Sequence, residues 1–137
     1  LDALSYGGTF DEMVVEREFF IPGSDPHGYL MGPIDMVGPA RCIVYGPFLY
    51  LPVGDWVADL RFQLVENFSG NVLEVDVFHG EVLVSESFSL PAEGHFSASA
   101  HFDVHDPLEA VQLRLILREG AIEGTIDLEE GVLRRAE

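Results

Sequence analysis

Polar side chains that could bind a ligand recur at alternate positions of three segments with a strand pattern. Apolar residues occupy the intervening positions, so the polar ones face away from the expected core. Planar Arg, Asp and Gln side chains can form the paired hydrogen bonds that adjacent sugar hydroxyls require. If the segments share a sheet, these groups converge on one face, and we expect that face to bind a carbohydrate. The predicted ligand-binding residues are Arg61, Gln63, Asp76, Gln112 and Arg114, with Asp59 and Glu74 beside them.

A solvated sheet surface is the alternative interpretation of these residues. Arg and carboxylate side chains on neighbouring strands often pair with one another in water and bind nothing else. A sugar site also needs an aromatic platform for the apolar face of the ring. Phe78 shares the register of Glu74 and Asp76, whereas Trp56 falls on the apolar positions of its segment and is expected in the core.

Two carboxylates two residues apart raise the alternative of glycoside hydrolysis. Glu74 and Asp76 on one strand face would lie about 7 Å apart, a separation compatible with paired catalytic carboxylates. Such pairs also occur wherever an acidic strand faces water, and no nucleophile motif accompanies this one. The sequence therefore predicts a protein without catalytic residues.

The histidines do not have the spacing of a zinc site. His95, His101 and His105 fall on one face of a predicted strand, but His101 and His105 would be about 13 Å apart. One zinc ion with ligand bonds near 2 Å cannot join them. Cys42 is the only cysteine, which excludes an internal disulfide, and its apolar neighbours predict a small buried residue.

The sequence predicts no cofactor, but its loop carboxylates could bind a structural calcium ion, which is the alternative. Calcium prefers carboxylate and carbonyl oxygens of the kind that such loops supply. No spaced calcium-binding motif joins these positions. The loop carboxylates are Asp25, Asp35, Asp55 and Asp106.

The charge of the chain narrows the classes of partner. The 24 acidic residues outnumber the 7 basic ones, which are all arginines, so the formal net charge is −17. This charge repels phosphate backbones and anionic lipid headgroups, which predicts neither nucleic acid nor a membrane as partner. Neutral sugars, cations and basic proteins remain as candidate partners. The sequence names no compartment; with no apolar leader and no apolar run near 18 residues, it favours the cytoplasm.

Apolar residues alternate with polar ones in successive segments, a pattern typical of strands. Gly, Pro, Asn or Asp separates most of these segments, and no window has a sustained helical period. The spacing predicts an all-β fold: a two-sheet antiparallel β-sandwich, jelly-roll-like, with about eight strands and minimal helix. The predicted strands cover about residues 13–20, 43–51, 56–65, 72–79, 82–90, 95–105, 111–118 and 122–128.

The length fits a single domain over residues 1–137, which begins with Leu1 and can be a piece of a longer chain. Residues 21–40 hold four prolines and four glycines, which predicts a long irregular connection. Residues 129–135 are expected to end the last strand and enter a polar tail. Asn67 lies in an Asn-Phe-Ser glycosylation motif.

One segment resembles a known family. Residues 45–56, Tyr-Gly-Pro-Phe-Leu-Tyr-Leu-Pro-Val-Gly-Asp-Trp, are similar to a Gly-Pro segment between two strands of carbohydrate-binding-module-like domains. Such domains are attached to bacterial glycosyltransferases and surface-polysaccharide proteins. Trp56 stands here where the family usually has Tyr, residues 75–77 resemble a following strand, and residues 111–114 resemble a late strand with Gln112 in place of an acid. The resemblance implies a jelly-roll sandwich and glycan recognition, and it carries over no catalytic residue. The same prolines and glycines have a physical role as turn formers around a short apolar strand.

The function predicted from the sequence is thus a non-catalytic carbohydrate-binding module. The alternative is a structural or protein-interaction module, which forms a homo-oligomer or docks on a catalytic domain of the parent chain. Its contact would be an exposed sheet edge or an aromatic patch of Phe19, Phe20, Tyr29 and Tyr50.

Overall fold

A computed structural model describes residues 12–136. Within them it has ten strands and one turn of 3₁₀ helix, Arg17–Phe19. The prediction of one domain over residues 1–137 thus extends beyond the described residues at both ends. The strands are β1 (Glu12–Glu16), β2 (Ile21–Pro22), β3 (Ile34–Asp35), β4 (Arg41–Leu49), β5 (Gly54–Val65), β6 (Val72–Phe78), β7 (Val82–Ser89), β8 (Gly94–Val104), β9 (Val111–Leu117) and β10 (Thr125–Arg135).

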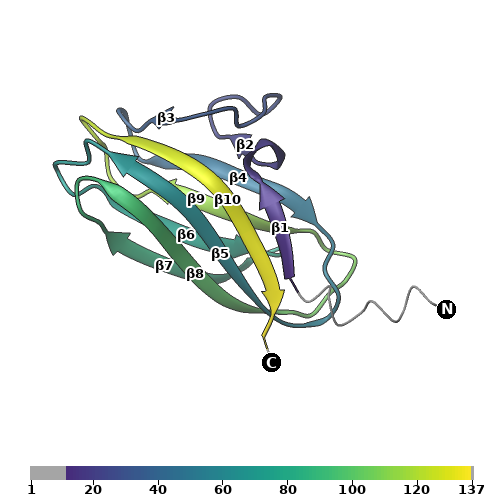
Figure 1. Ribbon diagram of the computed structural model, residues 1–137. Helices are drawn as coiled ribbons and strands as arrows, with labels where there is room; N and C mark the ends of the chain where they lie inside the picture. The colour runs from purple at the N-terminus through teal and green to yellow at the C-terminus, as the bar shows by residue number, and fades with distance from the viewer. Residues whose placement is uncertain (1–11, 137) are drawn as a thin grey trace.

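The strands form two antiparallel sheets that pack face to face (Figure 1). Sheet A has the order β1-β10-β5-β8, with β3 paired to one end of β10; sheet B has the order β2-β4-β9-β6-β7. From β4 onward, only β6 and β7 are consecutive strands that pair with each other, so the chain otherwise crosses between the sheets at each connection. The prediction of an all-β, two-sheet antiparallel sandwich is confirmed.

The core lies between the sheets and follows the predicted alternation. Phe62 and Leu64 of β5 and Leu115 and Leu117 of β9 all belong to this core and are buried, and Phe62 stacks on Phe88 of β7. Their neighbours in sequence point outward, because successive side chains of a strand lie on opposite faces. Burial of this apolar surface is the main source of stability, at roughly 25 cal/mol per Å².

The Gly-Pro segment carries the chain from sheet B to sheet A. It includes the end of β4, the loop that follows and the start of β5. The indole N–H of Trp56 donates to the carbonyl of Pro52 at 2.9 Å, and the Trp56 ring is buried, as expected. The segment therefore has the role in shaping the fold that its turn formers predicted.

Two predictions at the strand ends are wrong. The first strand stops at Glu16 rather than continuing to residue 20, because residues 17–19 form the 3₁₀ turn. Residues 129–135 do not form a tail: β10 continues through Arg135, with an irregularity in its register beside Glu129. Gly131 lies inside this strand, where a side chain would meet the ring of Phe20 at 3.0 Å.

The long connection over residues 21–40 is confirmed, interrupted by the short strands β2 and β3. Leu30 and Met36 are buried and anchor it to the core. Phe20, at the start of this region, is 1% exposed and packs under Gly131, so it cannot belong to a surface aromatic patch as predicted. Phe19 and Tyr29 are exposed, as is Tyr50.

Within residues 12–136, no helix has the length and apolar character required to cross a membrane.

Candidate ligand-binding face

The five predicted ligand-binding residues do not converge. Arg61 and Gln63 lie on β5 in sheet A, whereas Asp76, Gln112 and Arg114 lie on β6 and β9 in sheet B. All five point away from the core, so the two groups lie on opposite outer surfaces of the sandwich. We name these surfaces the Arg61 face, over β10, β5 and β8, and the Arg114 face, over β4, β9, β6 and β7. The expectation of one shared face is therefore wrong.

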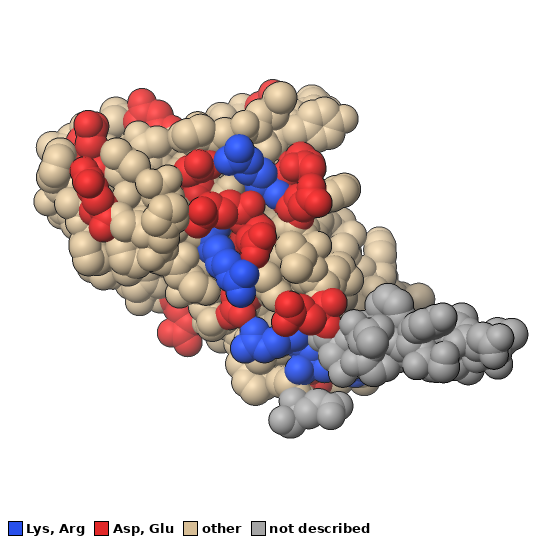
Figure 2. All heavy atoms as spheres, viewed as in Figure 1, with Lys and Arg blue, Asp and Glu red and all other residues tan. Residues whose placement is uncertain are grey.

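The Arg61 face is a network of ion pairs. Arg61 contacts Glu130 at 2.7 Å, and Arg134 contacts Asp59 at 2.5 Å. Figure 2 views this side of the molecule and shows basic side chains interspersed with acidic ones. Among the outward-facing residues of β5, β8 and β10 that the structure describes, none is Phe, Tyr or Trp. These ion pairs are of the kind expected on a solvated sheet surface, the alternative that the sequence left open for Arg61 and Gln63.

Asp59 holds that network together across three strands. Burial raises the pKa of its carboxyl group, but the hydrogen bonds from Ser99 and Arg134 outweigh it and hold the pKa below its ordinary value. Asp59 therefore stays ionised and joins β8 and β10 to β5, which indicates a structural role.

The Arg114 face is organised by an ion pair whose carboxylate is buried and whose guanidinium is partly exposed. Arg114 donates from Nε and Nη2 to the two carboxylate oxygens of Asp76, at 2.8 and 2.6 Å. Asp76 is only 2% exposed, although it points outward, because the guanidinium covers it. The hydrogen bond to Asp76 raises the pKa of Arg114, so the guanidinium remains charged. The carboxylate thereby fixes the orientation of Arg114.

Aromatic side chains flank this arginine. The guanidinium carbon of Arg114 lies 4.7 Å from the centre of the Phe78 ring. Tyr45 is opposite Arg114 on β4, and Gln112 is opposite Phe78 on β6. Tyr45 also packs edge-on against Phe48, with 6.3 Å between the ring centres. The Arg114 face therefore combines an oriented cation, an amide and aromatic rings.

Tyr45 was missed from the sequence because of a register irregularity. The pairing of β4 with β9 shifts between Cys42 and Val44, and both Ile43 and Val44 are buried. Such a bulge reverses the alternation that follows it. The face of sheet B on which Tyr45 lies thus depends on how β4 pairs with β9, which cannot be predicted from the local sequence pattern.

The arrangement leaves hydrogen-bonding capacity for a ligand. A guanidinium has five N–H groups, and the two bonds to Asp76 engage two of them. The side chain of Arg114 is partly exposed, as is Gln112, and Ser85 follows Asp76 in the same cross-strand row. These groups can donate to and accept from hydroxyls that lie across β9 and β6.

Each of the two paired carboxylates has a partner in the structure. Glu74 accepts a hydrogen bond from Ser87 at 3.3 Å and lies 3.5 Å from Arg118. Asp76 is covered by Arg114. A glycosidase needs one carboxyl group free to give a proton and another free to act on the sugar or on water. In this structure an arginine lies beside each of the two carboxylates.

Among residues 12–136, no group of three or more His, Cys, Asp or Glu side chains is placed to hold a metal ion. His95 contacts Glu129 at 3.2 Å, whereas His105 packs against His79. Three of the four loop carboxylates cap their own turns, accepting a backbone N–H two residues ahead: Asp25 from His27, Asp35 from Val37 and Asp106 from Leu108.

Cys42 and Asn67, which the sequence singled out, both have contacts within the fold. Cys42 is partly rather than fully buried, and this burial raises the pKa of its thiol, which donates to the carbonyl of Val44. Asn67 of the glycosylation motif is 1% exposed. Its amide nitrogen donates to the carbonyl of Leu90, and its oxygen accepts from Asn71 at 2.7 Å. In the folded protein, the side-chain nitrogen that would carry a glycan is therefore buried.

His79 was expected only to end a strand, but the structure buries it. Its Nε2 accepts the backbone N–H of Asp106 at 3.3 Å, and its ring packs edge-on against His105. His79 therefore fastens the loop after β8 to the end of β6.

Comparisons with known proteins agree on the fold. No protein-family model matches the chain, and no curated protein matches its sequence. Among solved structures, a CBM36-1 domain of a multidomain xylanase, from the hindgut metagenome of Trinervitermes trinervoides, is similar with a TM-score of 0.56 and 15% identity. That similarity covers 92% of this chain and 98% of the other.

Two ligand complexes are also similar. TmCBM61 in complex with β-1,4-galactotriose has a TM-score of 0.54 at 11% identity, over 93% of this chain and 90% of the other. The carbohydrate-binding module CBM36 in complex with calcium and xylotriose has a TM-score of 0.52 at 13% identity, over 90% of this chain and 99% of the other. At such identities the likeness shows the fold: this chain has the jelly-roll-like β-sandwich found in these carbohydrate-binding modules.

Proposed function

We propose that this protein is a non-catalytic carbohydrate-binding module and that its ligand lies across the Arg114 face. The observation that carries the proposal is the position of Arg114 between Asp76, Phe78 and Tyr45. A guanidinium held by a buried carboxylate loses little conformational freedom on binding, and aromatic rings favour the apolar face of a sugar. The fold shared with carbohydrate-binding modules supports the same function.

The charges of the protein favour an uncharged glycan. On the Arg114 face, Arg114 and Arg118 are paired with Asp76 and Glu74, so the two basic groups are already neutralised. The protein as a whole carries −17 charges, which repels uronic acids and sulfated sugars. We therefore propose neutral oligosaccharides as the ligand class.

The context of the module belongs to the same proposal. Residues 45–56 resemble a segment of domains attached to bacterial glycosyltransferases and surface-polysaccharide proteins. We propose that this domain likewise directs a larger bacterial protein to a glycan, with no cofactor of its own. The role of Gln112, which replaces an acid of that family, would be to contact sugar hydroxyls without adding charge.

A glycan array tests the proposed function most broadly. The protein is expected to bind a restricted set of neutral oligosaccharides, while anionic glycans give no signal. Titration of the best neutral oligosaccharide should move the NMR resonances of β9 and β6 on the Arg114 face. If no neutral glycan binds at millimolar concentration, or if the affected residues lie on the Arg61 face, the proposal is wrong.

A further inference from the structure

The loop of residues 105–110, which joins β8 to β9, has no apolar anchor between its two ends. Residues 105–109 are all exposed, and Leu108 is 85% exposed. Within the loop, the side chain of Asp106 accepts the backbone N–H of Leu108, and its carbonyl accepts the N–H of Glu109. These bonds shape the turn but do not attach it to a sheet. Its attachment depends on contacts with the end of β6.

His79, directly after β6, supplies the main contact. Its ring is 2% exposed, and its Nε2 accepts the backbone N–H of Asp106 at 3.3 Å. His105 packs edge-on against the ring, with 4.7 Å between the ring centres. Glu109 lies over Gly80, where an added Cβ would meet its Oε1 at 2.5 Å. The loop is thus held by one buried histidine and by side chains that are themselves exposed.

The hydrogen bond from Asp106 requires a neutral His79. A ring nitrogen that accepts a hydrogen bond carries no proton, so the ring hydrogen is on Nδ1. Nδ1 is buried and has no hydrogen-bond partner among residues 12–136. A protonated ring would direct an N–H of its own toward the N–H of Asp106, and neither of its N–H groups would have an acceptor. Acid therefore opposes this contact.

The titratable groups around the ring do not compensate a proton on His79. His105 faces the ring, and Asp106 directs its carboxylate into its own loop. Glu81 accepts the backbone N–H of His79 through its carbonyl, and both Glu81 and Glu109 are exposed. None of these carboxylates bonds to the ring, because Nε2 is engaged by a backbone N–H and Nδ1 has no partner.

The loop leads directly into the proposed sugar site. β9 begins at Val111, and the next residue, Gln112, lies opposite Phe78 of β6. Phe78 precedes His79 in sequence and packs on the guanidinium of Arg114. The contact made by His79 therefore lies at the junction of the two strands that carry these side chains.

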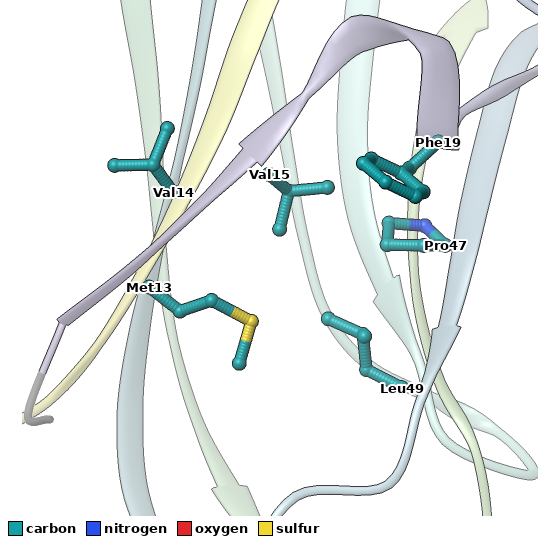
Figure 3. A pocket seen from close by; sticks show the side chains of 6 residues that line it. All are labelled: Met13, Val14, Val15, Phe19, Pro47 and Leu49. Carbon is teal, nitrogen blue, oxygen red and sulfur yellow. The ribbon is translucent and has the colours of Figure 1, made fainter.

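The start of β9 has less regular support from β4. The pairing of β4 with β9 shifts just before Leu49, which is the residue opposite Val111. Leu49 also lines an apolar groove of about 190 Å³, and in Figure 3 Met13 and Val15 point toward it from β1. Close packing is incomplete on this side. The β6 side, where the loop is held, therefore matters more for the position of these first residues.

We propose that His79 is a pH-sensitive positioning residue of the Arg114 face. Neutral His79 holds residues 105–110 against the end of β6 and so keeps Gln112 beside Phe78, whereas protonation of His79 releases the loop. Binding of neutral oligosaccharides then weakens in mildly acidic solution. This effect on a glycan rests on the proposed function, but release of the loop is measurable without a ligand.

NMR spectroscopy of the native protein tests the release of the loop. Between about pH 7.5 and about pH 5.5, where histidines ordinarily change charge, the amide of Asp106 should shift and lose protection from hydrogen exchange. His79→Gln is the matched variant, because the oxygen of a glutamine amide accepts a hydrogen bond and does not titrate in this range. In this variant the protection of the Asp106 amide should be the same at both pH values.

Isothermal titration calorimetry with the best neutral oligosaccharide tests the effect on binding. Its Kd for the native protein should rise at least about twofold over the same pH range, because a site that is competent in half of the molecules halves the apparent affinity. His79→Gln should bind equally well at both pH values. His105→Gln is the control for the neighbouring histidine and should keep the pH dependence of the native protein.

Three results would each overturn the inference. One is an Asp106 amide that stays protected at about pH 5.5 in the native protein, a measurement that needs no variant to fold. The second is an equal response to pH in the native protein and in His79→Gln. The third is loss of the response in His105→Gln, which would assign it to His105. Release of the loop in the native protein alone supports the role of His79, whereas absence of glycan binding at both pH values counts against the proposed function.

Discussion

Asp76 lies beneath Arg114, and both of its carboxylate oxygens accept hydrogen bonds from that one guanidinium, at 2.8 and 2.6 Å. The two partners differ in exposure: Asp76 is almost inaccessible, whereas Arg114 reaches solvent. The buried carboxylate therefore stabilises the sheet, and the guanidinium presents an oriented cation to solvent. This asymmetry leads to a prediction about each partner.

Removing the cation should destabilise the protein more than removing the carboxylate. Arg114→Ala removes both hydrogen bonds to Asp76 and uncovers its carboxylate, which stays partly desolvated and without a partner at a cost of about 2 kcal/mol. Asp76→Ala leaves an arginine that can turn toward water, so we expect a loss of about 1 kcal/mol. Urea denaturation monitored by fluorescence measures both values. An equal or reversed order would show that the carboxylate is not desolvated in solution.

Acid should weaken the contribution of Asp59 to stability. Its folded pKa is lower than its ordinary value, so the contribution is complete above about pH 4 and is lost as the pH falls through the folded pKa. The difference in unfolding free energy between the native protein and Asp59→Asn should therefore shrink below about pH 4. Ser99→Ala, which removes a donor to Asp59, should show part of the same effect. A difference that stays constant down to the acid transition would contradict this account.

The side-chain amide of Asn67 should contribute about 2 kcal/mol to stability, because its loss leaves the carbonyl of Leu90 and the backbone N–H of Asn71 without their partner. Chemical denaturation of Asn67→Ala measures this loss. Phe68→Ala, next in the chain and exposed, serves as the control and should stay within about 0.5 kcal/mol of the native protein. For the same reason, the folded domain should resist glycosylation at Asn67, and a glycan found there would show that the site opens.

Removal of divalent metal ions should leave the thermal stability unchanged. Among residues 12–136, no group of three or more His, Cys, Asp or Glu side chains is placed to hold an ion, and calcium needs six to eight oxygen ligands. Differential scanning calorimetry with excess chelator and then with excess calcium should give midpoints within about 1 °C of each other, because a ligand that binds only the folded state would raise the midpoint. A clear rise with calcium would restore the calcium alternative.

The fold could be predicted because the alternation of apolar residues is a local property of each strand. This alternation correctly predicts which side chains of β5, β6 and β9 face the core. The partner of each strand is a long-range property, and for this reason Arg61 and Arg114 could not be assigned to different sheets from sequence. A bulge hid Tyr45, and the 3₁₀ turn at residues 17–19 reversed the exposure expected for Phe20. Asp76, Gln112 and Arg114 were correctly expected together, because β6 and β9 do pair.

The carbohydrate site is tested most directly by matched variants on the two outer faces. Gln112 and Gln63 are both partly exposed glutamines on central strands, the first on the Arg114 face and the second on the Arg61 face. Isothermal titration calorimetry with the best neutral oligosaccharide would compare Gln112→Ala and Gln63→Ala, after circular dichroism has shown that both fold. We expect Gln112→Ala to weaken binding about tenfold and Gln63→Ala to leave it unchanged, since loss of a ligand hydrogen bond costs about 1–1.5 kcal/mol. Equal affinities for the two variants, or a loss only with Gln63→Ala, would contradict a sugar site on the Arg114 face.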